Sequence, residues 1–288
     1  MAVPANWQGT PEHFYHFFLG YFMPLVLWQE RSGASEVAVR DCGPMNAWFD
    51  LLQQGTDVEM MPPGVMLERV LSHRQERVIL HDWDNPTRFH RRSLDEFTQA
   101  VLPRAVDAAS PSSSSTAGRT PRITLLERRP NPEYYHSGTA ETPGGGSEWR
   151  SVPNIDDIAD ALAPLGDVRI VDTAELEPRD QVRTIHETDL LIAQHGAGLA
   201  NLVWLPSGAG VIELLPPLPP TIDTIFRNLA AARRVGYRAV DQSDLHAPVE
   251  PVDVVAAASI VLADPSACVP TATGSMPMRL LRQGPRRL

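Results

Sequence analysis

Residues 189–215 read DLLIAQHGAGLANLVWLPSGAGVIELL, and this stretch decides the class of fold. The apolar run at 189–193 predicts a strand buried on both faces, which is typical of a parallel sheet covered by helices. A glycine-containing turn follows, then a short helix at about 199–204 and a second apolar strand at 211–215. A strand, a helix and a strand in this order predict a βαβ unit, in which ligands bind at the carboxyl ends of the strands.

The same alternation extends to both sides of this stretch. After residue 120 we expect three further strands, at 122–126, 168–171 and 237–240. We expect helices between them: one that Asn154 caps and that ends at Gly166, one at 178–187, and one from Ile222 to about Gly236. Before residue 107 the pattern is similar but less regular, with helices at 12–28, 46–54 and 93–104 and strands at 36–39 and 77–80. The predicted fold class is α/β, with two Rossmann-like domains that face a cleft.

A serine-rich stretch divides the chain. Residues 107–120 read DAASPSSSSTAGRT, have no apolar periodicity and predict a flexible linker. This linker separates an N-terminal α/β domain at 1–106 from a C-terminal Rossmann-like domain at 121–264. The tail at 265–288 is rich in Pro, Gly and Arg, and we expect it to be poorly ordered.

The composition excludes several classes of function. The formal net charge is −10, so we expect no general attraction for nucleic acid, and a phosphate-bearing ligand needs a local site. The chain contains no lysine, which excludes a P-loop lysine and a Schiff-base lysine. Its two cysteines, Cys42 and Cys268, form no metal-binding pattern. The apolar stretch at 14–28 is interrupted and too short for a membrane span, and no signal peptide precedes it, so we expect a cytoplasmic location.

The turn His195-Gly-Ala-Gly198 carries the most specific chemistry. Its two glycines allow a ligand to approach the backbone closely, and the amide groups at the start of the next helix favour an anion. His195, at the end of the strand, can donate to a phosphate or a sugar oxygen. The alternative is a tight strand-to-helix turn with an internally bonded histidine. An esterase oxyanion loop is excluded, because the chain lacks the GxSxG motif that such an enzyme requires.

The stretch 189–215 resembles the central motif of glycosyltransferase family 61. The family pattern there is an apolar strand, HGAGL, a small residue, Asn, an apolar run, Pro, and then Val-Ile-Glu. Arg128, in Leu-Leu-Glu-Arg, is similar to an arginine that the family carries after the first strand of this half. Arg150 and Asn154 match a later Arg and Asn of the family, and Tyr15-His-Phe17 matches an aromatic element near its N-terminus.

This resemblance implies a GT-B fold and inverting transfer of a sugar from a nucleotide-sugar donor without an essential metal. It also implies that Arg128 neutralises the donor diphosphate, a role that suits a bidentate guanidinium. The expected donor is UDP-linked, and no other cofactor is expected. The 1–106 domain is expected to bind the acceptor, a glycan or another glycoconjugate, as in polysaccharide biosynthesis. The implied donor site contains Arg128, Arg150, Asn154, His195, Gly196, Ala197, Gly198, Leu199, Asn201 and Glu213.

Two of these assignments have alternatives in the sequence. Glu213 either bonds the ribose hydroxyls or caps the following turn, and Arg150 either binds the donor or pairs with Glu148. Two other functions also fit a nucleotide-sugar site on this fold. One is a nucleotide-sugar epimerase, which interconverts the donor without an acceptor. The other is a binding protein that has lost catalysis.

His16 and Asp82 are the candidates for the general base that inverting transfer needs. A neutral imidazole suits this role, although His16 lies on an apolar helix where a histidine is often part of the core. Asp82-Trp-Asp84 also matches a DxD metal site, in which paired carboxylates hold a divalent cation, but a polar turn accounts for the same triplet. We expect no bound metal.

Overall fold

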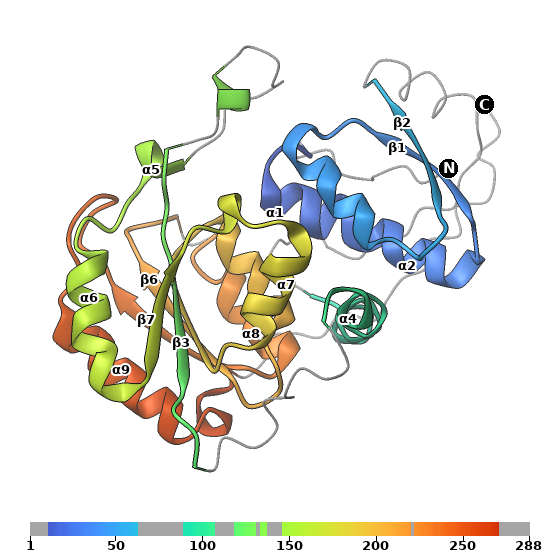
Figure 1. Cartoon of the computed structure of the whole chain (residues 1–288). Helices are drawn as coiled ribbons and strands as arrows, with labels where there is room; N and C mark the ends of the chain where they lie inside the picture. The colour runs from blue at the N-terminus through green and yellow to red at the C-terminus, as the bar shows by residue number, and fades with distance from the viewer. Residues whose placement is uncertain are drawn as a thin grey trace.

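The computed structural model describes residues 11–62, 89–106, 118–130, 133–136, 146–219 and 222–270. Its C-terminal half is built on a parallel sheet in the order β4-β3-β5-β6-β7 (Figure 1). The strands are β3 (Arg122–Leu126), β4 (Asp167–Val171), β5 (Leu190–Gln194), β6 (Gly210–Leu215) and β7 (Gly236–Asp241). The order reverses at β3, because β4 pairs with one of its edges and β5 with the other. In such a sheet the ligand crevice opens at the carboxyl ends of β3 and β5.

Helices cover both faces of this sheet (Figure 1). On one face lie α6 (Ile155–Leu162) and α9 (Pro251–Ala263), which bury apolar side chains against inward-facing residues such as Ile123 and Ile212. On the other face lie α7 (Pro178–His186), α8 (Ile225–Arg233) and the short 3₁₀ helix η6 (Ala197–Trp204). All five residues of β5 are buried, as its apolar run predicts. The predicted α/β class with a parallel sheet is therefore confirmed.

The N-terminal half begins with one helical segment in three parts. These are α1 (Phe14–Phe17), a π-helical turn η1 (Phe18–Phe22) and α2 (Met23–Ser32). Pro24 has no N–H to donate to the carbonyl of Gly20, and the widened turn accommodates this loss. None of the helices within the described ranges is both long enough and apolar enough to cross a membrane.

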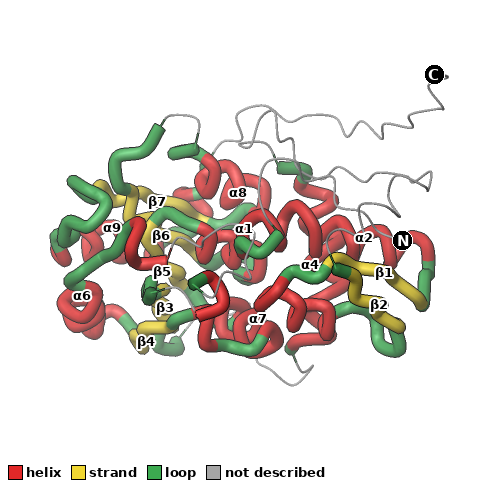
Figure 2. The backbone as a smooth tube through the Cα atoms, turned by 90° about the horizontal axis from the view of Figure 1, so that it is seen from above, coloured by secondary structure: helices red, strands yellow, loops and turns green. Residues whose placement is uncertain are grey.

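Two parallel strands and two helices make up the rest of what the structure describes in this half. They are β1 (Glu36–Arg40), η2 (Gly43–Leu51), β2 (Asp57–Met61) and α4 (Arg91–Ala105). Figure 2 shows the β1–β2 pair at the end of the molecule opposite α6, with α4 between the pair and the larger sheet. The predicted strand at 77–80 lies outside the described residues, as does most of the serine-rich stretch.

An aromatic cluster joins the two halves. Trp204, at the end of η6, is fully buried, and its ring centroid lies 5.1 Å from that of Phe97 on α4 and 5.4 Å from that of Phe18 on η1. Trp48 stacks on the same indole, with an angle of 10° between the ring planes. These residues belong to a hydrophobic core that continues into the sheet. The helix that follows His195 is therefore anchored at its far end in the N-terminal half.

Several short elements connect the larger ones: η3 (Glu133–Tyr135), α5 (Gly146–Trp149), η4 (Ala163–Leu165), η5 (Thr173–Glu175) and η7 (Ser266–Cys268). Asn154 stands directly before α6, as predicted, but the predicted capping hydrogen bond is wrong, because its side chain makes no such bond to α6. Its amide instead bonds Val249, donating to the carbonyl at 2.8 Å and accepting from the N–H at 3.0 Å. Asn154 thus ties the start of α6 to the segment before α9.

Candidate active site

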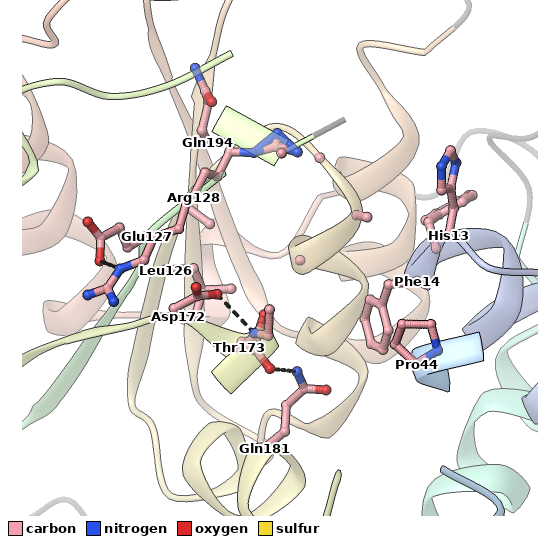
Figure 3. A pocket seen from close by; sticks show the side chains of 18 of the residues that line it. His13, Phe14, Pro44, Leu126, Glu127, Arg128, Asp172, Thr173, Gln181 and Gln194 are labelled. Carbon is pink, nitrogen blue, oxygen red and sulfur yellow. Dashed lines mark hydrogen bonds and ion pairs between the residues drawn. The ribbon is translucent and has the colours of Figure 1, made fainter. Parts of the chain in front are cut away.

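A cavity of about 600 Å³ opens at the carboxyl ends of β3, β4 and β5. The sheet contributes the residues that follow these strands, from Leu126, Asp172 and Ala193 onward. The opposite wall comes from the N-terminal half, at 13–16, 44–45 and 47–48. Figure 3 shows Arg128 extending from the end of β3 into this space, with His13, Phe14 and Pro44 on the far side. The cavity therefore lies at the switch point of the sheet and between the two halves.

The turn after β5 and the arginine after β3 meet in this cavity. Gly196 precedes the first residue of η6, and the guanidinium of Arg128 lies directly against its Cα. A Cβ placed on Gly196 would be only 2.6 Å from Nη2 of Arg128, closer than real atoms approach. Residue 196 must therefore be glycine if Arg128 is to keep this position. The structure brings together the two motifs that the sequence analysis places in one site.

Arg128 is partly buried, and no described residue supplies a counter-charge to it. Within the described part of the chain it forms no ion pair, and its Nη1 is buried with no hydrogen-bond partner. Burial, and secondarily the charge of Arg150, lower the pKa of Arg128 to about 10. Burying a guanidinium N–H without a hydrogen-bond acceptor lowers the stability of the folded protein, and an anionic ligand that accepts this hydrogen bond would remove the penalty.

Arg150 brings a second guanidinium to the same turn. Its Nη1 donates to the backbone carbonyl of His195 at 3.1 Å. Burial lowers the pKa of Arg150, while the charge of Glu213 acts in the opposite direction. No pair between Arg150 and Glu148 is found among the described residues, so the contact to the His195 turn is the one that fixes Arg150. Two cations thus converge on Gly196.

His195 is held by a carboxylate behind it. Its Nδ1 lies 2.5 Å from Oε1 of Glu213, which is completely buried on β6. The hydroxyl of Tyr237, on the neighbouring β7, donates to the other oxygen, Oε2, at 2.6 Å. Both oxygens of Glu213 are therefore occupied by protein groups. The structure supports neither a ribose contact nor a turn cap as the role of Glu213.

The predicted donor-site residues divide into two groups. Those that line the cavity are Arg128, Arg150, His195, Gly196, Ala197 and Gly198. Those that do not are Asn154, Leu199, Asn201 and Glu213. Leu199 and Asn201 are fully buried, and the amide of Asn201 donates to the carbonyl of Gly198 at 3.1 Å, which braces the turn from within. Tyr237, the second partner of Glu213, gives no motif signal in the sequence.

Of the two base candidates, His16 lines the cavity and Asp82 lies outside the described residues. Burial, and next the charge of His13, lower the pKa of His16 to about 4. Its imidazole is therefore neutral at physiological pH, the state in which it can accept a proton. The DxD triplet also lies outside the described residues, and among the residues that are described no cluster of three or more His, Cys, Asp or Glu could hold a metal ion.

His16 predicts a loss of stability in mild acid. Its pKa is about 4 in the folded protein, against 6.5 for an unperturbed histidine, so between these values the unfolded chain binds more protons. The free energy of unfolding should therefore fall as the pH falls from 6.5 to 4, by at most roughly 3 kcal/mol for this one group. Urea unfolding at several pH values should show a weaker pH dependence in His16→Gln than in the wild type. The exposed His136→Gln is the control, and equal slopes in all three proteins would contradict this account.

Asp172 is a cavity residue that the sequence analysis did not single out. It follows β4, lines the cavity (Figure 3) and accepts a hydrogen bond from the backbone N–H of Ala174 at 2.9 Å. Burial is the main cause that raises its pKa. The sequence feature that could have identified Asp172 as a site residue is its position directly after the predicted strand at 168–171. Trp149 and Tyr135 also line the cavity, and neither lies in a segment with a regular sequence pattern.

The chain is an α/β protein with a cavity at the switch point of its parallel sheet, which is where such sheets commonly bind ligands. The sequence pattern of the family Glycosyltransferase 61 matches residues 14–212 of this chain. This match covers more than half of the chain and includes Arg128, the His195 turn and most of the N-terminal wall of the cavity. The chain belongs to glycosyltransferase family 61.

Curated proteins similar to this chain include EGF domain-specific O-linked N-acetylglucosamine transferases. The Mus musculus protein is 43% identical over 72 residues, which are 24% of this chain and 14% of the relative. The Drosophila melanogaster protein is 36% identical over 132 residues, which are 44% of this chain and 21% of the relative. The Bos taurus protein is 39% identical over 90 residues, 26% of this chain and 17% of the relative. The matches thus cover 21% or less of the length of these relatives.

Proposed function

We propose that this protein is an inverting, metal-independent glycosyltransferase whose nucleotide-sugar donor binds at the switch point of the sheet. The observation that carries the proposal is the buried guanidinium of Arg128, which has an unused donor and lies against Gly196. The diphosphate of the donor would accept hydrogen bonds from Arg128 and from the first amide groups of η6, which have no partner within the helix. Family membership supports sugar transfer as the reaction.

The charges around Gly196 support a diphosphate in particular. Arg128 and Arg150 bring two cations, and the carboxylate of Glu213 is turned away from the cavity toward His195 and Tyr237. A nucleotide sugar carries one negative charge on each of its two phosphate groups, so it would balance the two guanidinium groups. A planar guanidinium also binds two phosphate oxygens at once.

The acceptor would enter from the N-terminal wall, in a GT-B-like arrangement of two Rossmann-like domains. His16 lies on that wall, and its neutral imidazole would remove the proton from the acceptor hydroxyl. The hydroxyl oxygen would then attack the anomeric carbon from the side opposite the diphosphate, which inverts the configuration. The acceptor would be a glycan or another glycoconjugate. A UDP-linked donor is the first to test, since the named relatives transfer N-acetylglucosamine.

A thermal-shift screen against UDP- and GDP-linked sugars tests the donor site directly. A ligand at about 100 times its dissociation constant stabilises the folded state by roughly 2.7 kcal/mol, which raises the melting temperature by several degrees. We expect one nucleotide class to produce this shift and the corresponding free sugars to produce none. A panel in which no nucleotide sugar raises the melting temperature would contradict the donor proposal.

Turnover is expected to survive removal of divalent metals, because two arginines take the place of a cation at the diphosphate. Release of nucleoside diphosphate should require an acceptor and should continue at the same rate in excess EDTA. Loss of this activity in EDTA, with recovery on adding Mn²⁺ or Mg²⁺, would contradict the metal-independent mechanism. Conversion of the donor without any acceptor would indicate an epimerase instead.

A further inference from the structure

A buried chain of hydrogen bonds runs from β7 to the cavity. The Tyr237 hydroxyl donates to Glu213, and Glu213 in turn accepts from Nδ1 of His195, with oxygen–oxygen and nitrogen–oxygen distances of 2.6 and 2.5 Å. Glu213 is 0% exposed and His195 is 5% exposed. Burial, and secondarily the charge of Glu213, raise the pKa of Tyr237, so its hydroxyl keeps the proton that it donates.

This chain fixes the tautomer of His195. An ionised carboxylate only accepts, so the proton between His195 and Glu213 belongs to Nδ1. The other ring nitrogen, Nε2, makes no hydrogen bond to any described residue, although His195 lines the cavity. The ring of Phe226, also on the cavity wall, holds the imidazole edge-on at a centroid distance of 5.0 Å. The imidazole is thus presented with one nitrogen anchored and one available to a ligand.

Several charged and titratable groups lie around His195. Glu213 belongs to β6 and Tyr237 to β7, with Asp223 and Arg227 near the phenol. Arg150 bonds the His195 carbonyl, and Arg128 lies against the next residue. The N-terminal wall of the same cavity adds His13 and His16. Glu213 is thus the one carboxylate in hydrogen-bonding contact with the imidazole among the described residues.

We propose that Tyr237 and Glu213 are positioning residues, which hold His195 so that its protonated Nε2 donates a hydrogen bond to the donor diphosphate. This inference rests on the proposed function of the cavity. In the complex the imidazolium would lie between two anions, Glu213 at Nδ1 and a phosphate oxygen at Nε2. The second proton comes from solvent on binding and returns to solvent on release, so no covalent bond is made or broken between heavy atoms. Donor affinity should therefore decrease as the pH rises, because binding takes up a proton.

The test uses calorimetric titration of the full chain with UDP-N-acetylglucosamine and, in parallel, with GDP-mannose. The diphosphate and base groups of these probes keep a constant charge from about pH 5.5 to about pH 8, so a pH dependence within this range comes from the protein. Wild-type affinity should decrease as the pH rises. Tyr237→Phe should bind about three- to tenfold more weakly, as expected for loss of one hydrogen bond that positions a charged pair. Glu213→Gln should also bind more weakly than the wild type, because the imidazolium has lost its anionic partner.

Tyr21→Phe is the matched control. Its hydroxyl accepts a hydrogen bond from the backbone N–H of Arg40 at 2.6 Å in the N-terminal half, so it loses a similar buried bond outside the site. Its affinity should equal that of the wild type. If the Tyr237→Phe and Glu213→Gln proteins both bind the probes with wild-type affinity and pH dependence, the inference is wrong. If Glu213→Gln does not fold, the result for Tyr237→Phe alone decides. If instead wild-type and Arg128→Ala proteins bind the probes equally, or neither binds, the proposed function itself fails.

Discussion

Replacing Arg128 with alanine is expected to weaken donor binding by about 30- to 150-fold, which corresponds to roughly 2–3 kcal/mol. The guanidinium is buried, lies at the switch point and has an unused donor, so an anionic ligand would gain charge-assisted hydrogen bonds that alanine cannot make. Isothermal titration with the nucleotide sugar selected by the thermal-shift screen measures this loss directly. Arg128→Lys should recover part of the affinity, since it keeps the charge but not the bidentate geometry.

The same substitution should behave differently in the unliganded protein. Burial of a cation without a counter-charge is unfavourable, so Arg128→Ala should have a melting temperature equal to or above that of the wild type. Arg169→Ala is the control, because Arg169 is exposed, pairs with Asp167 and does not line the cavity. Its donor affinity should not change. Equal affinity in the Arg128→Ala and Arg169→Ala proteins would show that Arg128 does not bind the donor.

Gly196→Ala should abolish most donor binding while leaving the fold intact. Gly196 has a φ of +157°, which alanine adopts only with strain. The new Cβ would also lie 2.6 Å from Nη2 of Arg128, whose flexible side chain can move away. The guanidinium would then leave its position, so the affinity should decrease about as much as in Arg128→Ala. Titration calorimetry measures the affinity, and circular dichroism checks that the fold is retained.

Two comparisons make this prediction specific. A Cβ on Gly198 would meet Leu126 Cδ1 at 3.5 Å, an ordinary contact, so Gly198→Ala should weaken binding far less than Gly196→Ala. In the Arg128→Ala background the clash is absent, so Gly196→Ala should add only the loss that comes from backbone strain at its φ of +157°. Additive losses of donor affinity in the double variant would contradict a shared mechanism. They would show that Gly196→Ala acts through the backbone conformation and not through Arg128.

The sheet could be predicted from the sequence because each strand leaves a local pattern. The strand at 122–126 has the predicted bounds, and the strands observed at 167–171, 190–194, 210–215 and 236–241 begin or end within one residue of those predicted. Continuous apolar runs identify strands that are covered on both faces. Strand β2, by contrast, was not predicted: it reads Asp-Val-Glu-Met-Met, carries charges, and is exposed at its first residue. The helix at 251–263 was not predicted either, although Pro251 at its start and Asp253 in its first turn are signals of a helix.

The site was predictable where a motif lies in one segment, and less so where contacts join distant segments. The meeting of Arg128 with the His195 turn follows from the sheet, because both come directly after strands that the topology makes neighbours. The role of Glu213 does not follow in this way. Its place on β6 was predictable. Its contacts were not, because Tyr237, which donates to Glu213, belongs to the neighbouring strand β7. The packing of Trp204 against the N-terminal half likewise depends on tertiary structure.

The most direct test of the donor site is a crystal structure of the protein with its nucleotide-sugar donor or the corresponding nucleoside diphosphate. We expect phosphate oxygens within about 3 Å of the Arg128 guanidinium and of the amide groups that follow Gly196. We also expect the sugar end to face the wall that carries His16. A nucleotide bound elsewhere, with Nη1 of Arg128 still buried and without a partner, would contradict the central claim.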